Sequence, residues 1–180
     1  DDNTYDITVS CECFEHNPYW FETFLNMYRM TTPGGIVIFT CATRGRLEHG
    51  TRRTSPKTSP GSQEVGWDYY MNFEAKDFTK RTSFEELFDT HLFLTNKNSL
   101  DLFFCGRKFG EDSRFRFDKD RFVQDHEQQQ EMIKKCFKTH GSWNERINSQ
   151  IRFLIHLPIR LTIYLPEKHF QNFSIKYLKL

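Results

Sequence analysis

The hydrophobic pattern is clearest near the start of the chain, where it predicts a strand, a helix and a second strand. Residues 5–11 and 36–41 are apolar and β-branched runs of strand length. A helix is expected over residues 19–31, ended by Pro33-Gly34-Gly35, because glycines after a proline favour a left-handed exit. Its apolar residues recur with the i, i+3, i+4, i+7 spacing of one helix face: Phe21, Phe24, Leu25 and Tyr28. The pattern therefore predicts one β-α-β unit with parallel strands that are buried on both faces.

The segment directly after the first predicted strand is where chemistry is expected, because ligands of parallel sheets bind beyond the carboxyl ends of the strands. Glu12, Glu15 and His16 have i, i+3, i+4 spacing. On a helical turn that spacing converges two carboxylates and an imidazole, a set suited to Mg²⁺ or Zn²⁺. The alternative is that Glu15 and His16 cap the following helix or pair with each other. His16 is also a candidate general base, and His49 is a second candidate.

A long segment without apolar period, residues 44–66, follows the second strand and is rich in Thr, Ser, Pro, Gly and Arg. Loops of this length are usually functional lids or mobile surface segments, and both interpretations stay open. Its first part is basic, which favours an anionic substrate group such as a phosphate, with Arg52 and Arg53 as contacts. Trp67, Tyr69 and Tyr70 come next and are either substrate contacts at a pocket rim or core aromatics.

The pattern then indicates the end of a first domain. Ser83 and Glu86 have capping-box spacing and predict a short helix. Residues 91–95 and 100–105 read as two strands around the polar turn 96–98, which predicts an antiparallel hairpin.

Beyond the hairpin the chain changes character. A helix is expected from Asp118 to about residue 140, with a modest stripe, and a second helix ends at Pro158. The second has a more regular apolar spacing: Trp143, Ile147, Ile151 and Leu154. We therefore divide the chain into residues 1–109 and a helical extension with a tail, residues 110–180.

Several of these blocks carry a family resemblance. The order YDxxxSCExxEH, a helix and PGGxxxxTCA resembles the second half of a class I S-adenosylmethionine-dependent methyltransferase, from its fourth strand onward. GWDYYMNFEAKDF, EELF and NSLDLFFCGRKF resemble the closing part of the same domain. The resemblance implies an α/β fold, a partial Rossmann-like sheet of parallel strands closed by an antiparallel hairpin. It also implies methyl transfer to an oxygen or nitrogen of a small-molecule acceptor.

The resemblance further implies that Ser10, Cys11 and Glu12 line the S-adenosylmethionine pocket and that Glu15 and His16 are catalytic. The E-x-x-E-H order is similar to a divalent-metal motif of some 2′-O- and ubiquinone-pathway O-methyltransferases, in which the metal polarises the acceptor hydroxyl. The sequence has no G-x-G-x-x-G turn, the element that holds the cofactor in such folds. We therefore expect an amino-terminal half of the domain as partner, and weak or no cofactor binding by this chain alone.

Composition adds limits on the setting. The 180 residues include 19 Phe and carry a net charge of +1, which favours a packed domain and gives little support to nucleic-acid binding through the basic loop. The five cysteines are interpreted as reduced thiols of a cytoplasmic protein. No apolar run has the roughly 18 residues of a membrane helix, so no membrane partner is expected. The alternative to an enzyme is a non-catalytic interaction module built on a truncated methyltransferase fold.

Overall fold

The computed structural model describes residues 1–110, 117–139, 168–169 and 171–172. The chain divides into two compact units, Asp1–Lys119 and Asp120–Leu180, and each is described by itself. The sheet and the candidate site belong to the first unit.

The predicted β-α-β unit is confirmed. Strand β1 (Tyr5–Cys11) is followed by helix α1 (Trp20–Met30) and strand β2 (Thr31–Ala42). The two strands pair in parallel, with Ile7 opposite Ile36 and Cys11 opposite Thr40.

The buried face of α1 differs from the predicted one by part of a turn. Trp20, Phe24 and Met27 are buried, whereas Leu25 is exposed. The helix also ends without a left-handed residue, because Thr31 is extended and its hydroxyl donates to the carbonyl of Met27 at 2.7 Å. The left-handed conformation occurs three residues later, at Gly34, inside the longer strand β2.

The predicted hairpin is confirmed and is longer than expected. Strands β3 (Phe88–Asn96) and β4 (Asp101–Lys108) are antiparallel, and the side-chain Oδ1 of Asn96 accepts from the backbone of Asn98 in the turn. The strand order is β1-β2-β4-β3, with β4 antiparallel to β2. This mixed α/β sheet, parallel between β1 and β2 and then closed by an antiparallel hairpin, matches the predicted partial Rossmann-like arrangement.

Two short helices, α3 (Ala75–Thr79) and α4 (Phe84–Leu87), connect the loop region to the hairpin. Ser83 stands before α4 as predicted, but its side chain makes no capping hydrogen bond. The capping box forms instead at α3, between Glu74 and Asp77, where each side chain reaches the other residue's backbone.

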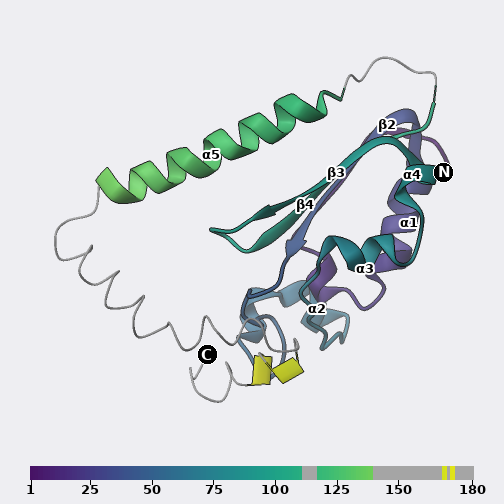
Figure 1. Ribbon diagram of the computed structural model, residues 1–180. Coiled ribbons are helices and arrows are strands. Elements are labelled where there is room, and N and C mark those ends of the chain that lie inside the picture. The colour runs from purple at the N-terminus through teal and green to yellow at the C-terminus, as the bar shows by residue number, and fades with distance from the viewer. Residues whose placement is uncertain (111–116, 140–167, 170, 173–180) are drawn as a thin grey trace. The chain divides into compact units, whose positions relative to one another are not determined.

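The core lies where α1, α3 and α4 cover one side of the sheet (Figure 1). Phe39 of β2 lies near its centre, with its ring centroid 4.7 Å from that of Phe78 and 4.8 Å from that of Phe104. Eight phenylalanines are buried in this core, which accounts for much of the heavy aromatic composition: Phe14, Phe24, Phe39, Phe73, Phe78, Phe84, Phe88 and Phe104.

Strand β1 corrects the expectation that both central strands are buried on both faces. It is the end strand of the described sheet, and Tyr5, Ile7 and Val9 are 52%, 46% and 58% exposed. These three alternate residues share one face, whereas Thr8 on the other face is buried and its hydroxyl lies 2.8 Å from that of Thr31. One face of β1 is therefore packed and the other is open in the described part of the chain.

The long segment after β2 is folded back on the sheet end. It contains a 3-10 turn (Pro56–Thr58) and helix α2 (Pro60–Glu64), and Thr43 and Phe73 form a bridge where it leaves and returns. We call residues 43–73 the capping loop. Its hydrogen bonds give it a defined conformation.

Helix α5 (Lys119–Thr139) confirms the predicted helix after Asp118. The second predicted helix, with Trp143 to Leu154, and most of the tail lie outside the described residues. Within the described residues, no helix combines the length and apolar character needed to cross a membrane.

Candidate functional site

The candidate site is the turn that follows β1, at the carboxyl ends of both parallel strands. A 3-10 turn, Phe14–His16, follows Glu12, which is itself left-handed with φ of 50°. The amide of Glu12 donates to the carbonyl of Thr40 at 2.9 Å and so holds the turn against the end of β2. Because Glu12 lies outside the helical turn, the expected convergence of Glu12, Glu15 and His16 does not arise from helix spacing.

Glu15 is the most unusual residue of this turn. Its side chain is 0% exposed, and neither carboxyl oxygen has a hydrogen-bond partner among the described residues. Burial raises the pKa of Glu15 to about 8, and the nearby carboxylate of Glu12 adds to the effect. The group is therefore largely protonated at neutral pH.

His16 is held under the capping loop. It is 8% exposed, and its ring centroid lies 4.9 Å from that of His49 and 5.5 Å from that of Tyr70. Its buried Nδ1 has no hydrogen-bond partner among the described residues. Burial lowers the pKa of His16 to about 4, and the positive charges of His49 and Arg46 act in the same direction. The imidazole is therefore neutral at physiological pH, the form that a general base requires.

Gly50 allows the capping loop to reach His16. Its φ is +73°, and an added Cβ would lie 2.8 Å from His16 Cε1 and 2.6 Å from Ser59 Cβ. Only a residue without a side chain fits this close approach at low cost. The loop is also anchored by the amide of Met71, which donates to the Glu15 carbonyl at 3.0 Å.

Arg46 connects the capping loop to the rim of the sheet. Its guanidinium pairs with Asp101 at the start of β4, and its Nη2 lies 3.8 Å from a carboxylate oxygen of Glu12. Its backbone carbonyl accepts from Asn72 Nδ2, and the Asn72 Oδ1 accepts from the hydroxyl of Tyr70. The ring next to His16 is thus tied to the same network.

The structure brings some predicted residues to the site and places others elsewhere. Tyr70 contacts His16, whereas Trp67 packs against Tyr19 with centroids 5.8 Å apart. Tyr69 is half-buried against the phenylalanine core and donates to Met71 Sδ.

The two predicted anion contacts have other roles. Arg53 forms a charge-assisted pair with the buried carboxylate of Glu48, so its charge is already compensated. Arg52 is exposed, and its backbone amide donates to Asp68 at 2.7 Å. Glu48 therefore compensates part of the positive charge of the loop, and Arg52 and Arg53 do not form an arginine cluster.

The predicted cofactor contacts lie at the rim. Cys11 and Glu12 are exposed, and Ser10 is half-buried. The positions of Cys11 and Glu12 are compatible with a ligand beyond the end of β1, since both can be reached from solvent. The described thiols Cys11, Cys13, Cys41 and Cys105 are free.

The predicted metal set is not assembled. Within the described residues, no group of three or more His, Cys, Asp or Glu side chains is placed to hold a metal ion. The physical reason is that the three side chains have different surroundings: Glu12 faces Arg46, Glu15 is buried, and His16 packs on aromatic rings. The described residues therefore give no support to a metal centre at this turn.

Sequence reasoning missed three residues that shape this site: Arg46, Gly50 and Asp101. In the sequence Arg46 is one of several basic residues of the loop, and Asp101 falls within a predicted strand. Asp101 lies opposite Ala42 in the β2–β4 pairing, so it reaches the rim only because those strands are neighbours. Gly50 had a usable signal, since a glycine inside a long loop is typical of a left-handed residue.

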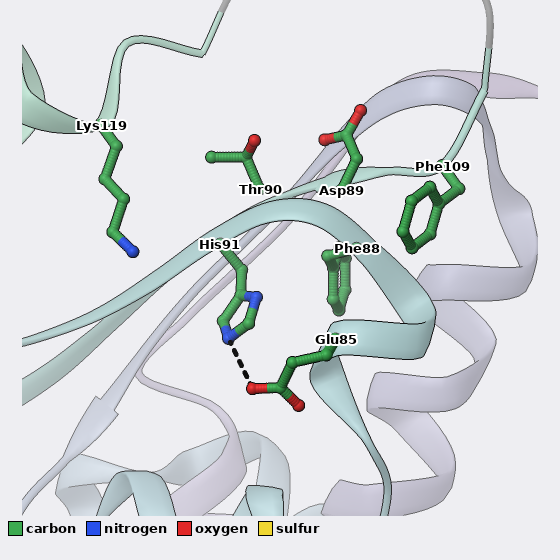
Figure 2. Close-up of a pocket in the computed structure, with 7 residues that line it drawn as sticks. All are labelled: Glu85, Phe88, Asp89, Thr90, His91, Phe109 and Lys119. Carbon is green, nitrogen blue, oxygen red and sulfur yellow. Dashed lines mark ion pairs between the residues drawn. The ribbon is translucent and has the colours of Figure 1, made fainter.

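A shallow pocket of about 290 Å³ lies at the start of β3 (Figure 2). Three of its ionisable side chains are already engaged, since His91 Nε2 lies 4.0 Å from Glu85 Oε1 and Asp89 pairs with Arg107 at 3.1 Å. It is lined by Glu85, Phe88, Asp89, Thr90, His91, Phe109 and Lys119. The turn after β1 remains the stronger candidate, because it holds a fully buried carboxyl group without a partner.

No family model matches the sequence, and no curated protein matches it. Similar solved structures include a chain from the Haloferax volcanii complex between the Trm112 methyltransferase activator and a methyltransferase, with 11% identity and a TM-score of 0.39. The match covers 63% of this chain and 58% of that one. Several of the structural neighbours are methyltransferases.

Two further neighbours are an N-methyltransferase and a carbon methyltransferase. Phosphoethanolamine N-methyltransferase 2 of Haemonchus contortus, in complex with S-adenosyl-L-methionine, has 15% identity and a TM-score of 0.38, with 86% of this chain and 31% of that chain covered. The CurJ carbon methyltransferase has 16% identity and a TM-score of 0.40, with 61% and 31% covered. This chain thus spans between about a third and three fifths of the neighbours it matches. At these TM-scores the likeness is loose, and the interpretation of the site depends on its own side chains.

Proposed function

We propose that this chain is the carboxyl-side part of an S-adenosylmethionine-dependent methyltransferase that acts on a small-molecule acceptor. The observation that supports this most is the position of the turn after β1, at the carboxyl ends of two parallel strands in a sheet closed by an antiparallel hairpin. Ligands of such sheets bind there. The turn also carries a carboxyl group with a raised pKa and an imidazole with a lowered pKa, a combination typical of acid–base sites.

In this proposal the rim residues Ser10, Cys11 and Glu12 contact the cofactor. The exposed carboxylate of Glu12 suits a ligand with hydroxyl groups, because a carboxylate accepts hydrogen bonds from them. The cofactor, when bound, supplies an electrophilic methyl group. His16 and Glu15 hold or accept the proton that the acceptor loses.

The capping loop forms the acceptor side of the proposed site. Tyr70 and His49 lie directly on His16, so an acceptor that reaches this imidazole displaces the loop or uses an opening in it. The exposed Arg52 and the half-buried Trp67 belong to the same loop and are proposed as outer substrate contacts.

The proposed partner is the amino-terminal part of the same kind of domain. The end strand β1 has an open edge in the described sheet, and a further parallel strand there would continue the Rossmann-like arrangement. That part would supply the glycine-rich turn that this sequence lacks. In this arrangement residues 1–109 close the catalytic domain and residues 110–180 extend it. The exposed free thiols Cys11 and Cys13 fit a reducing compartment, which supports a cytoplasmic setting.

The proposal is tested by adding S-adenosylhomocysteine to ¹⁵N-labelled protein and following backbone amide shifts. We expect weak, millimolar binding that shifts the amides of Ser10, Cys11 and Glu12. Glu12→Gln weakens this binding, while Asp6→Asn at the amino end of the same strand leaves it unchanged. Shifts confined to the hairpin, or no shifts after an amino-terminal segment with a glycine-rich turn is added, contradict the proposal.

A second candidate, a non-catalytic interaction module, is favoured by one specific observation. Three large apolar side chains on one face of the end strand, Tyr5, Ile7 and Val9, are about half exposed. Exposed apolar stripes on edge strands are typical association surfaces. If this candidate is correct, the chain alone unfolds cooperatively on heating, and S-adenosylhomocysteine shifts neither the amides of the rim nor the melting temperature. A chain that aggregates alone and is stabilised by an added amino-terminal segment supports the enzyme.

A further inference from the structure

The buried carboxyl group of Glu15 is poorly compensated within the fold, because the backbone amides of Glu15 and Ala42 lie near enough to lower its pKa but do not outweigh burial. It is fully buried, and neither of its two oxygens has a hydrogen-bond partner among the described residues. Burying such a group without compensation costs free energy that native proteins usually avoid. A buried, unpartnered acid of this kind indicates a ligand that supplies the missing donors.

Other carboxylates act together with Glu15 on the neighbouring thiol of Cys41. Burial is the main reason that the pKa of Cys41 is raised well above its ordinary value, and four nearby carboxylates act in the same direction: Glu15, Glu12, Asp101 and Asp77. Arg46 contacts two of these groups, Asp101 closely and Glu12 at 3.8 Å. The separation from Glu12 is long, so the Glu12 carboxylate retains capacity for a second cation. The corner therefore carries an excess of acidic groups over the cation that contacts it.

We propose that this acidic corner, formed by Glu12, Glu15 and Asp101, binds the ammonium group of an amine substrate, with Glu15 as its direct partner. The assignment of that amine as the methyl acceptor rests on the proposed function, whereas its binding does not. An ammonium group fits better than a sulfonium because the oxygens of Glu15 need N–H donors, and a sulfonium has none. It fits better than an alcohol because the surrounding carboxylates favour a positive charge.

Exposed residues lie beside the corner on the rim side. Glu12 and Cys13 are both exposed, and the carboxylate of Glu15 is close enough to Cys13 to contribute to its raised pKa, after burial as the main cause. The amine would enter from the end of β1, where ligands of parallel sheets bind.

The same geometry gives Glu15 a role in proton transfer. An ammonium nitrogen must lose a proton before its lone pair can react. In that step one N–H bond breaks, an O–H bond forms on the ionised carboxylate of Glu15, and the two opposite charges are neutralised together. Burial alone keeps Glu15 protonated near neutral pH, but the charge of a bound ammonium group favours the ionised carboxylate, which can then accept the proton.

The experiment uses methylammonium chloride as the probe, without any methyl donor. Backbone amides of the ¹⁵N-labelled chain are followed during titration, with potassium chloride at equal ionic strength and trimethylsulfonium chloride as comparisons. We expect saturable shifts of the residue 12–15 amides with methylammonium, and weaker shifts with trimethylsulfonium because it has no N–H group. Glu15→Gln weakens methylammonium binding about tenfold or more, since a charged hydrogen-bond partner is lost.

Controls keep the result interpretable. Gln is a neutral isostere of the buried acid, so the amide spectrum of Glu15→Gln should stay dispersed, and Glu64→Gln on exposed helix α2 should bind as the wild type does. Equal shifts with potassium chloride, equal or tighter binding of trimethylsulfonium, or unchanged binding by Glu15→Gln each overturn the proposal. The S-adenosylhomocysteine titration is a separate measurement. Loss of cofactor binding with retained methylammonium binding therefore refutes the proposed function and leaves the amine site standing.

Discussion

The phenylalanine core and the corner at Glu15 are buried to the same degree but are built in opposite ways. Around Phe39 five phenylalanine rings pack together, and each gains from being removed from water. At the corner, a carboxyl group and an imidazole nitrogen are removed from water without hydrogen-bond partners among the described residues. The core therefore stabilises the fold, whereas the corner costs stability that only a bound ligand could restore. A comparison of the two regions by mutation separates structural burial from functional burial.

The largest effect is expected in the core. Phe39→Ala removes the ring that contacts five other phenylalanine rings and should lower the free energy of unfolding by about 3–5 kcal/mol. Urea unfolding followed by circular dichroism measures this loss. Phe109→Ala, at a half-exposed position, is the matched control and should change stability by less than about 0.5 kcal/mol. A comparable loss in both variants would mean that the Phe39 cluster is not the core.

Replacing the ionisable side chain of Glu15 should instead raise the free energy of unfolding. Below pH 4.5 the carboxyl group is protonated in both states, and between 4.5 and about 8 the unfolded chain loses the proton while the folded chain keeps it. Stability therefore falls as pH rises through this window, by at most about 1.4 kcal/mol per pH unit from this group. Glu15→Gln abolishes that slope. The free energy of unfolding of the variant, relative to that of the wild type, should therefore rise by about 2 kcal/mol from pH 6 to pH 8.

Unfolding curves across this pH range measure the Glu15 effect. Glu64→Gln serves as control, because Glu64 is exposed and its loss should leave the slope in place. A wild-type slope that persists in Glu15→Gln would show that Glu15 ionises normally in the folded protein.

Gly50→Ala tests how the capping loop is held over His16. A Cβ at Gly50 meets His16 and Ser59 at 2.8 and 2.6 Å, whereas a Cβ at Gly66, also left-handed, meets nothing within 4 Å. Both substitutions strain the backbone, so their difference isolates the contact and should be about 1–2 kcal/mol. Thermal unfolding measures the difference. Hydrogen exchange at the Met71 amide should also quicken in Gly50→Ala alone, and equal exchange in the two variants would contradict the packing.

The smallest effect per pH unit concerns the protonation of His16. Its pKa is lowered from 6.5 to about 4, so between these values the unfolded chain binds a proton that the folded chain refuses. Stability should therefore fall as pH drops below about 6.5, by about 1 kcal/mol per pH unit, and His16→Gln should remove this part of the slope. The imidazole Cε1–H resonance gives a direct measurement, with a midpoint near 4 expected. A midpoint near 6.5 would mean that the ring is solvated and that the capping loop does not cover it.

The regular elements were predictable because their signals are local. The strand at Tyr5–Cys11, the helix after it and the hairpin around Asn96 follow from periodicity and turn residues, which act within a few positions. The burial of individual faces was less predictable. The outer face of β1 carries the same apolar residues as a buried strand, and only its place at the end of the described sheet leaves them exposed.

The sequence by itself determined the β-α-β unit, the hairpin and the location of polar residues after β1, since these depend on short-range pattern. What those residues face depends on long-range packing. The folded capping loop brings Gly50 to His16, and the pairing of β2 with β4 brings Asp101 to Arg46. The same packing buries the Glu15 carboxyl group without a hydrogen-bond partner among the described residues. Burial and charge proximity set the pKa values of Glu15 and His16, and both are properties of the assembled fold rather than of residue spacing.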